Sequence, residues 1–575
     1  MQKFLITSIL LLSGVLTFSQ VKKDTLKTEE IIVEKPYTPT ISDAFKITSN
    51  PTTDNATASS KEKVSYTIFS VPVASTFSPV KGTAQNIARE PKDRLFKNYI
   101  LAGFGNYTSP IFEAFLRSGK PRSNDFGVFI NHYSSQGGIK DLQLDDNFSD
   151  TRIDAYYKQF AKYNTWQINA GFQRQIQNYY GVPSSIIFNN AVIDAMNEKQ
   201  IYSKFYAGGK IEMENSFFQG ATAELVTFND DYGSNEIRLV AKPKFEFPIS
   251  TELINGEFMV DILTGQFDEN YLATDQINYS FLNLGFNPNF EVLRENFTLN
   301  LGAKLIYAND LEHQTNKFYA YPNVHTSLKI VDDIFIMIAG VEGDLKQNSY
   351  ANFASENLFV SPTLNIQLTN LKYQAYVGAK GKLASNFSYH LKVNYAQEEN
   401  KPLFVQNQTK TDGTIPVLKG YAAGNSFGVV YDTVTNLGFY GELNFNVSKE
   451  FNLTGAINYN NYDTSNELEA WNLPNLTATI SADYETKKWF SGAKLYFNSS
   501  TKDFIIPFGL TENSGFITTN DAFIDLNLNV GYHFSDRLMA FAKMNNALGT
   551  SYKKYVNYKV QSAQIFAGIT YKFDL

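Results

Sequence analysis

Five histidines are the first candidates for chemistry in this 575-residue chain, because imidazole serves both as a metal ligand and as a proton carrier. They lie far apart in the sequence, at His132, His313, His325, His390 and His533. No two of them have the spacing of a metal site, and the chain contains no cysteine that would complete a zinc site. Each histidine is therefore expected to be an ordinary residue of the lumen or of a loop.

Two acidic clusters offer oxygen ligands of the kind that Ca²⁺ prefers. One contains Asp141, Asp145, Asp146 and Asp150, and the other is Asn229-Asp230-Asp231. Neither has the ligand spacing of a calcium-binding loop, so a solvated extracellular loop is the favoured interpretation of both. No nucleophile elbow, phosphate loop or dinucleotide fingerprint occurs between a strand and a helix. The residue types predict neither an enzyme nor a metal or cofactor site.

A side-chain period of two dominates the chain from about residue 97 onward. Residues 297–307 and 524–534 alternate apolar and polar almost without interruption, and in the last strand Ile565, Ala567, Ile569, Tyr571 and Phe573 share one face. This alternation is typical of barrel strands with lipid outside and water inside. No apolar run after residue 20 approaches the roughly 20 residues of a membrane helix, so a membrane protein of this sequence must be a closed β-barrel. A soluble, secreted all-β protein is the alternative.

Short polar turns divide this region into pairs of strands. They fall near residues 119–120, 164–165, 214–215, 251–252, 295–296, 332–333, 385–386, 449–450, 486–487 and 536–537. Ten such turns predict a transmembrane antiparallel β-barrel of about 22 strands, with tight turns at one rim and long loops at the other. Residues 347–372 and 398–435 contain strand-like pieces such as Leu358-Phe359-Val360 and Gly428-Val429-Val430. Both stretches are assigned to long extracellular loops.

Charged residues on the polar strand faces should line the interior of the barrel. They include Lys304, Glu442, Lys494, Asp525 and Lys572. They could form a polar path for a solute, but any wide barrel has a wet, charged interior, and this simpler interpretation is favoured. Trp471, in an expected outer loop, could stack on a ligand or serve loop packing equally well.

The N-terminal fifth of the chain differs from the rest. Residues 1–19 have the positive start, apolar core and small-residue cleavage site of a signal peptide. Residues 20–96 are rich in Pro, Thr and Ser and are expected to form an irregular periplasmic segment, followed by the barrel at 97–575. The absence of cysteine excludes disulfides, and a net charge of −7 argues against binding of nucleic acid.

Residues 545–555, beginning Asn545-Asn546-Ala547-Leu548-Gly549, resemble the closing hairpin of TonB-dependent receptors of the outer membrane. The expected mature start at Gln20 and the overall texture resemble the Bacteroidota type of outer-membrane protein. Gly568, Tyr571 and Phe573 have the spacing of the C-terminal signal by which outer-membrane barrels are recognised by their insertion machinery. The patch Thr28, Glu29, Glu30, Ile31, Ile32, Val33 and Glu34 resembles a Ton box, which implies pairing with TonB or another periplasmic protein by strand addition.

The chain departs from the family in one respect. Receptors of this kind carry a plug domain of well over a hundred residues between the Ton box and the barrel, whereas only residues 35–95 are available here. The N-terminal segment, the long loops or a partner must then occlude the lumen. The resemblance implies solute uptake across the outer membrane of a Gram-negative cell. The alternatives are a plugless structural or assembly subunit of an outer-membrane complex with partner subunits, and a passive porin.

Overall fold

The computed structural model describes residues 95–120, 122–249 and 252–574. The predicted signal peptide, the Ton-box-like patch Thr28–Glu34 and residues 20–94 of the predicted periplasmic segment lie outside the described residues. The first strand of the barrel begins at Asn98.

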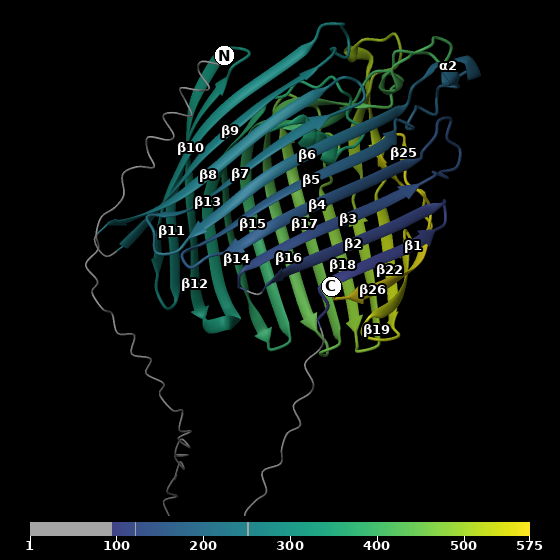
Figure 1. The fold of residues 1–575 in the computed structure, drawn as a ribbon. Helices are drawn as coiled ribbons and strands as arrows, with labels where there is room; N and C mark the ends of the chain where they lie inside the picture. The colour runs from purple at the N-terminus through teal and green to yellow at the C-terminus, as the bar shows by residue number, and fades with distance from the viewer. Residues whose placement is uncertain (1–94, 121, 250–251, 575) are drawn as a thin grey trace, which may run out of the picture. The chain divides into compact units, whose positions relative to one another are not determined.

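Twenty-two antiparallel strands form one closed barrel, as predicted from the turns (Figure 1). Each strand pairs with the next in the barrel, and the last pairs with the first, which closes the sheet. The barrel strands are β1 (Asn98–Gly105), β2 (Ser109–Lys120), β3 (Asn124–Ser135), β4 (Phe148–Phe160), β5 (Asn164–Asn178), β6 (Lys199–Met213), β7 (Phe218–Asn229), β8 (Asn235–Ile249), β9 (Glu252–Phe267), β10 (Ile277–Leu293), β11 (Phe297–Asp310), β12 (Thr315–Val331), β13 (Phe335–Gln347), β14 (Leu368–Ala384), β15 (Phe387–Gln406), β16 (Phe427–Asn446), β17 (Phe451–Thr464), β18 (Leu476–Glu485), β19 (Trp489–Asn498), β22 (Phe523–His533), β23 (Leu538–Asn545) and β26 (Gln564–Phe573).

The remaining elements are short and lie in the connections between barrel strands. They are the helices α2 (Asn190–Ala195) and α3 (Tyr350–Glu356), the 3-10 turns η2 (Asp332–Ile334), η3 (Gly420–Ala422) and η4 (Glu512–Ser514), and two small hairpins, β20 (Thr501–Ile505) with β21 (Phe516–Asn520) and β24 (Lys553–Tyr555) with β25 (Tyr558–Lys559). None of the helices in the described part of the chain is long and apolar enough to cross a membrane.

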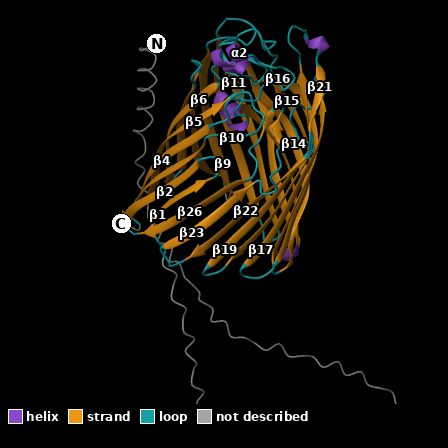
Figure 2. Ribbon diagram, turned by 90° about the vertical axis from the view of Figure 1, so that its right-hand side faces the viewer, coloured by secondary structure: helices purple, strands orange, loops and turns teal. Residues whose placement is uncertain are grey.

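The predicted short turns fall between neighbouring barrel strands in the described part of the chain, and the turn near 251–252 includes residues outside it. They lie at one rim, which we call the short-turn rim, and the longer connections gather at the other, the long-loop rim (Figure 2). The assignment of 347–372 and 398–435 to loops was wrong at the ends of both stretches. Residue 347 belongs to β13 and 368–372 to β14, while 398–406 belong to β15 and 427–435 to β16. Gly428-Val429-Val430 lies in β16 and pairs with Phe404 and its neighbours in β15. These two strands, of 20 residues each, are much longer than the roughly 9–11 residues that a strand needs to cross a bilayer, so they extend beyond the membrane.

The alternation of faces follows the predicted pattern. In β26, Ile565, Ile569 and Tyr571 are 52%, 54% and 45% exposed on the outside of the barrel, whereas Phe566 and Thr570 on the inner face are 3% and 4% exposed. Exposed apolar side chains on every second residue are what a lipid-facing wall requires. The outer face is therefore suited to hydrocarbon and the inner face to water.

The seam of the barrel depends on a glycine. Gly568 of β26 lies opposite Gly103 of β1 and Phe541 of β23, and a Cβ atom at this position would clash with the Ala102 carbonyl oxygen and the Phe541 ring. Tyr571 and Phe573 stack two residues apart at the foot of the same strand, with ring centroids 5.9 Å apart.

We expect Gly568→Val to lower the yield of closed barrel sharply, because overpacking costs about 1–3 kcal/mol and here it falls on the strand that closes the sheet. The fraction of protein that migrates as a folded barrel in unheated gel samples measures this effect. Gly455→Val in β17 is the control, because nothing lies within 4 Å of its Cβ position. Equal loss in the two variants would contradict the packing argument.

Candidate functional site: a loop cap at the long-loop rim

The largest apolar core of the described chain lies at the long-loop rim. It joins inward-facing residues of β6 to β10 to the connection between β13 and β14, residues 348–367, which we call the cap loop. The wall contributes Tyr202, Phe228, Leu263, Phe267, Tyr279 and Phe281, and the cap loop contributes Tyr350, Phe353, Ala354, Val360, Leu364 and Ile366. Because these wall residues face the interior, the cap loop folds inward over the mouth of the barrel.

A carboxylate of the wall holds the helix of the cap loop. Ser349 caps α3 by accepting a hydrogen bond from the Asn352 amide at 3.1 Å. Glu236 of β8, which is 2% exposed, accepts hydrogen bonds from the backbone amides of Tyr350 (2.6 Å) and Ala351 (3.2 Å). It also accepts one from the Tyr279 hydroxyl at 2.8 Å. A negative charge at the first amides of a helix is favourable, so Glu236 fixes where α3 begins and how it faces the wall.

A second carboxylate holds the buried tyrosine of α3. The Tyr350 hydroxyl donates to Asp230 at 2.7 Å, and Asp230 also accepts from the amides of Tyr232 (3.0 Å) and Ser234 (2.8 Å). Burial raises the pKa of the Asp230 carboxyl above its ordinary value. The Tyr350 ring meets Phe228 and other wall aromatics edge to face. Such pairs add stability beyond their buried area.

Two further loops hold the far side of the cap loop. The Tyr558 ring stacks on Phe359 with centroids 3.6 Å apart, and its hydroxyl donates to the Asn425 carbonyl. Tyr555 donates to the Glu356 carbonyl at 3.1 Å. These contacts connect the cap loop to residues 407–426 and 546–563, the loops after β15 and β23. The three loops therefore form one packed layer.

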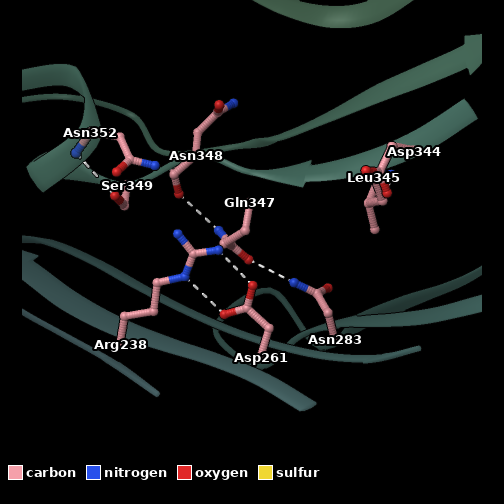
Figure 3. A network of polar contacts seen from close by, with 9 residues as sticks. All are labelled: Arg238, Asp261, Asn283, Asp344, Leu345, Gln347, Asn348, Ser349 and Asn352. Carbon is pink, nitrogen blue, oxygen red and sulfur yellow. Dashed lines mark hydrogen bonds and ion pairs between the residues drawn. The ribbon is translucent and has the colours of Figure 1, made fainter. Parts of the chain in front are cut away.

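A polar network supports the point where the cap loop leaves the wall (Figure 3). Gln347, the last residue of β13, accepts from the Asn283 amide at 2.8 Å and donates to the Asn348 carbonyl at 2.9 Å. Close by, Arg238 forms a bidentate ion pair with Asp261, with Nε–Oδ1 at 2.9 Å and Nη2–Oδ2 at 2.6 Å. Bidentate pairs of this kind have a fixed geometry, so the base of the cap loop rests on a rigid patch of wall.

Further towards the short-turn rim, the inner wall is charged and accessible to water. Its ion pairs include Arg152 with Asp154, Lys210 with Glu212 and Lys244 with Glu257, and the three basic side chains are 50%, 54% and 60% exposed. Side chains this accessible are not packed against another part of the described chain. The site is therefore an apolar cap over a wet, charged lumen.

No group of three or more His, Asp or Glu within residues 95–574, as far as they are described, could hold a metal ion. The solvated-loop interpretation was wrong for two of the aspartates: Asp150 lies in β4 and accepts from Gln173 and Gln175, and Asp230 holds the cap. Trp471 is 2% exposed and donates to Glu467, so it serves loop packing.

The sequence analysis missed Glu236, Tyr350 and Tyr558. One signal was present for the helix: Ser349 followed by Tyr350, Phe353 and Ala354 combines a capping residue with apolar residues at helical spacing. No local signal marks Glu236 or Tyr558, because the residues that they hold at the cap, Tyr350 and Asn425, lie more than a hundred residues away.

A buried aspartate in the β20–β21 hairpin predicts a dependence on pH. Asp503 accepts from Asn472 (2.8 Å) and two backbone amides, and burial raises the pKa of its carboxyl to about 6. The folded hairpin therefore binds its proton more tightly than the open one. Hairpin stability should fall as pH rises from about 4 to about 6, by about 3 kcal/mol in total, and then level off. Hydrogen exchange at residues 501–505 measures this, and Asp503→Asn should remove the pH dependence; a flat wild-type profile would contradict it.

The comparisons with known proteins show the fold. No family model matches the sequence, and no curated protein matches it. Among solved structures, the FrpB iron transporter from Neisseria meningitidis is similar over 84% of this chain and 82% of its own, with TM-score 0.62 and 10% identity. The ferripyoverdine receptor of the Pseudomonas aeruginosa outer membrane is similar over 84% of this chain and 72% of its own, with TM-score 0.60 and 9% identity. The siderophore receptor PiuA from Acinetobacter baumannii is similar over 84% of this chain and 82% of its own, with TM-score 0.58 and 8% identity. At this identity the likeness shows the fold alone, which is that of a 22-stranded outer-membrane barrel.

Proposed function

We propose that the protein is an outer-membrane barrel of the TonB-dependent receptor type that takes part in solute uptake, with the cap loop as the closure of its outer mouth. The observation that carries the proposal is the buried, doubly anchored cap loop above a wet lumen. A closure made of loops can open without dismantling the barrel, because its anchors are a few hydrogen bonds and one apolar cluster. The barrel shared with an iron transporter and siderophore receptors supports the same class of function.

The proposed energy input comes from the periplasm. Thr28–Glu34 would pair with TonB or a similar periplasmic protein by adding a strand to an open sheet edge. With only residues 35–95 between this patch and the barrel, we propose that the protein lacks a complete plug and that the cap loop takes over part of the plug's role. A plugless receptor of this kind would belong to a Bacteroidota-type outer membrane.

The route to the membrane follows from the two ends of the chain. The proposed signal peptide 1–19 directs export, and Gly568, Tyr571 and Phe573 are proposed as the signal read by the barrel-insertion machinery. In β26, Gly568 lies in close contact with the neighbouring strands β1 and β23. Tyr571 of the same strand faces outward, where outer-membrane lipids would lie.

Competitive growth tests the proposal. A strain lacking the protein should be outgrown by its parent on at least one nutrient, with chelated iron and copper among those supplied. The full chain should restore growth, and a chain lacking residues 28–34 should not, although it inserts equally well. Full restoration by the deleted chain would contradict energised uptake.

The alternative, a structural or assembly subunit without transport of its own, predicts a different result. The deletion strain would show no nutrient-dependent defect, and gentle extraction would yield the barrel in constant ratio with outer-membrane partner subunits. A protein that emerges alone and supports growth on a nutrient would exclude this alternative.

A further inference from the structure

The β20–β21 hairpin has one strand edge that nothing in the described chain covers. The hairpin continues β19 and β22 above the barrel wall at the long-loop rim (Figure 2). On the side of β20 that faces away from β21, the Asn472 amide donates to the Lys502 carbonyl at 2.8 Å. That edge therefore has a partner, and the open edge belongs to β21.

The register of the hairpin shows which backbone groups of β21 are open. In an antiparallel pair, opposite residues alternate between pairs that exchange backbone hydrogen bonds and pairs whose backbone groups point outward. Lys502 points its carbonyl away from β21, so Lys502 and its partner Thr519 form an outward-pointing pair. Two residues along, Phe504 and Ile517 form the next such pair. The N–H and C=O groups of Ile517 and Thr519 therefore face away from β20, and within the described chain neither residue makes a backbone hydrogen bond on that side.

This edge lacks the features that usually prevent strand addition. Natural proteins protect open edges with lysine, proline or inward-pointing charges. Residues 515–520, Gly-Phe-Ile-Thr-Thr-Asn, contain no proline and no charged residue. Phe516 and Ile517 are 52% and 41% exposed. An extended chain can thus pair with β21 and place an apolar side chain opposite Ile517.

A hollow of about 590 Å³ lies beside the open edge. It is lined by residues 519–523 on one side and by residues of the loop after β23 on the other, and none of its lining residues belongs to β20. Phe497 and Ile524 also line it, and they are paired across β19 and β22 on the outward face that carries Trp489. The hollow therefore opens on the outside of the barrel, next to the lipid-facing wall, and leaves room for a chain at the β21 edge.

We propose that β21 binds an extended segment of a neighbouring outer-membrane protein by strand addition. The edge is five residues long and offers only a few hydrogen bonds, too few to hold a free peptide firmly. A protein that shares the membrane supplies the segment at a high effective concentration, so the same few bonds suffice. A solute on its way to the lumen would not stay in a hollow that opens on the outside of the wall. This site does not depend on the uptake proposal.

Photo-crosslinking in intact cells tests the edge. A benzophenone side chain is introduced in place of Leu548, which lines the hollow and is 50% exposed. We expect one crosslinked product that contains a different outer-membrane protein. Thr519→Pro should lower its yield about tenfold, because proline removes the N–H that the added strand needs, and this corresponds to one lost hydrogen bond. Thr519→Val is the matched control, because it keeps the N–H and should leave the yield unchanged.

The remaining outcomes count against the proposal. Proline is tolerated at an open edge, so both variants should migrate as folded barrels in unheated gel samples. Equal yields in Thr519→Pro and Thr519→Val, or no product at all, would contradict strand addition. A product made of two copies of this chain would overturn the assignment to a different protein. The same benzophenone at Leu272, in the connection after β9, reports random encounters, and a matching fall there in Thr519→Pro would also contradict a role of the edge.

Discussion

Replacing the cap loop, residues 348–367, with an Asn-Gly turn is expected to change a nearly silent barrel into one with a large, steady ion conductance. The change is compatible with the wall, because Gln347 and Leu368 are paired residues of β13 and β14 and a two-residue turn can join such a pair. A 22-stranded barrel has a lumen wide enough for an aqueous channel once nothing covers it. Conductance of the purified chain in planar bilayers, about tenfold or more above wild type, is the expected readout.

The control alters the same rim without touching the cap. Residues 311–314 join β11 to β12, and replacing them with Asn-Gly shortens another connection at the long-loop rim. This control should remain as silent as wild type. If the chain without its cap loop were also silent, the block to conductance would lie elsewhere, and the cap would not be the closure of the barrel.

Glu236→Ala should loosen the cap without weakening the barrel. The substitution leaves the amides of Tyr350 and Ala351 and the Tyr279 hydroxyl without their acceptor in a buried place. Each unsatisfied donor costs about 1–3 kcal/mol, so opening of the cap should become easier by about 3 kcal/mol or more. Hydrogen exchange of residues 350–356 should then accelerate about a hundredfold, while the barrel strands keep their protection.

Glu246→Ala provides the comparison. Glu246 lies on the same face of the same strand, ten residues nearer the short-turn rim, and accepts from the Gln219 side chain at 2.8 Å. Its loss should leave exchange in α3 unchanged. Equal protection of α3 in wild type and Glu236→Ala would show that the apolar cluster alone holds the cap.

The barrel could be predicted from the sequence because its signal is local and repeated. Apolar and polar residues alternate in 524–534, and in the last strand Ile565 and Ile569 face outward while Thr570 faces inward. Each residue's face follows directly from its position along the strand. Turns such as 385–386 are equally local. The error at Gly428-Val429-Val430 arose because strands that extend beyond the membrane lose the contrast between a lipid face and a water face.

The cap could not be predicted, because its contacts are distant in the sequence. The cap loop was correctly assigned to a long loop, and Ser349 with Tyr350 and Phe353 contained a helix signal. The cap loop folds inward because it contacts residues far away in the sequence. Asp230 and Glu236 lie more than a hundred residues before their partner Tyr350, and Tyr558 lies about two hundred residues after its partner in the cap loop. From the sequence alone, Asp230 in a polar loop and Glu236 at the start of a strand are expected to be solvated, and only the folded structure shows that they are buried.

Labelling of single cysteines in intact cells tests most directly whether the chain's own cap closes the outer mouth. The protein has no cysteine, so any labelling of a single-cysteine variant comes from the introduced thiol. The probe is a maleimide carrying a polyethylene glycol chain too large for ordinary porins. Lys210→Cys places a thiol on the lumen wall, and Leu272→Cys places one on an outer loop at a residue that is 81% exposed. We predict that Leu272→Cys reacts, and that Lys210→Cys reacts only when residues 348–367 are replaced by the turn. Rapid labelling of Lys210→Cys in the chain with an intact cap would contradict the account.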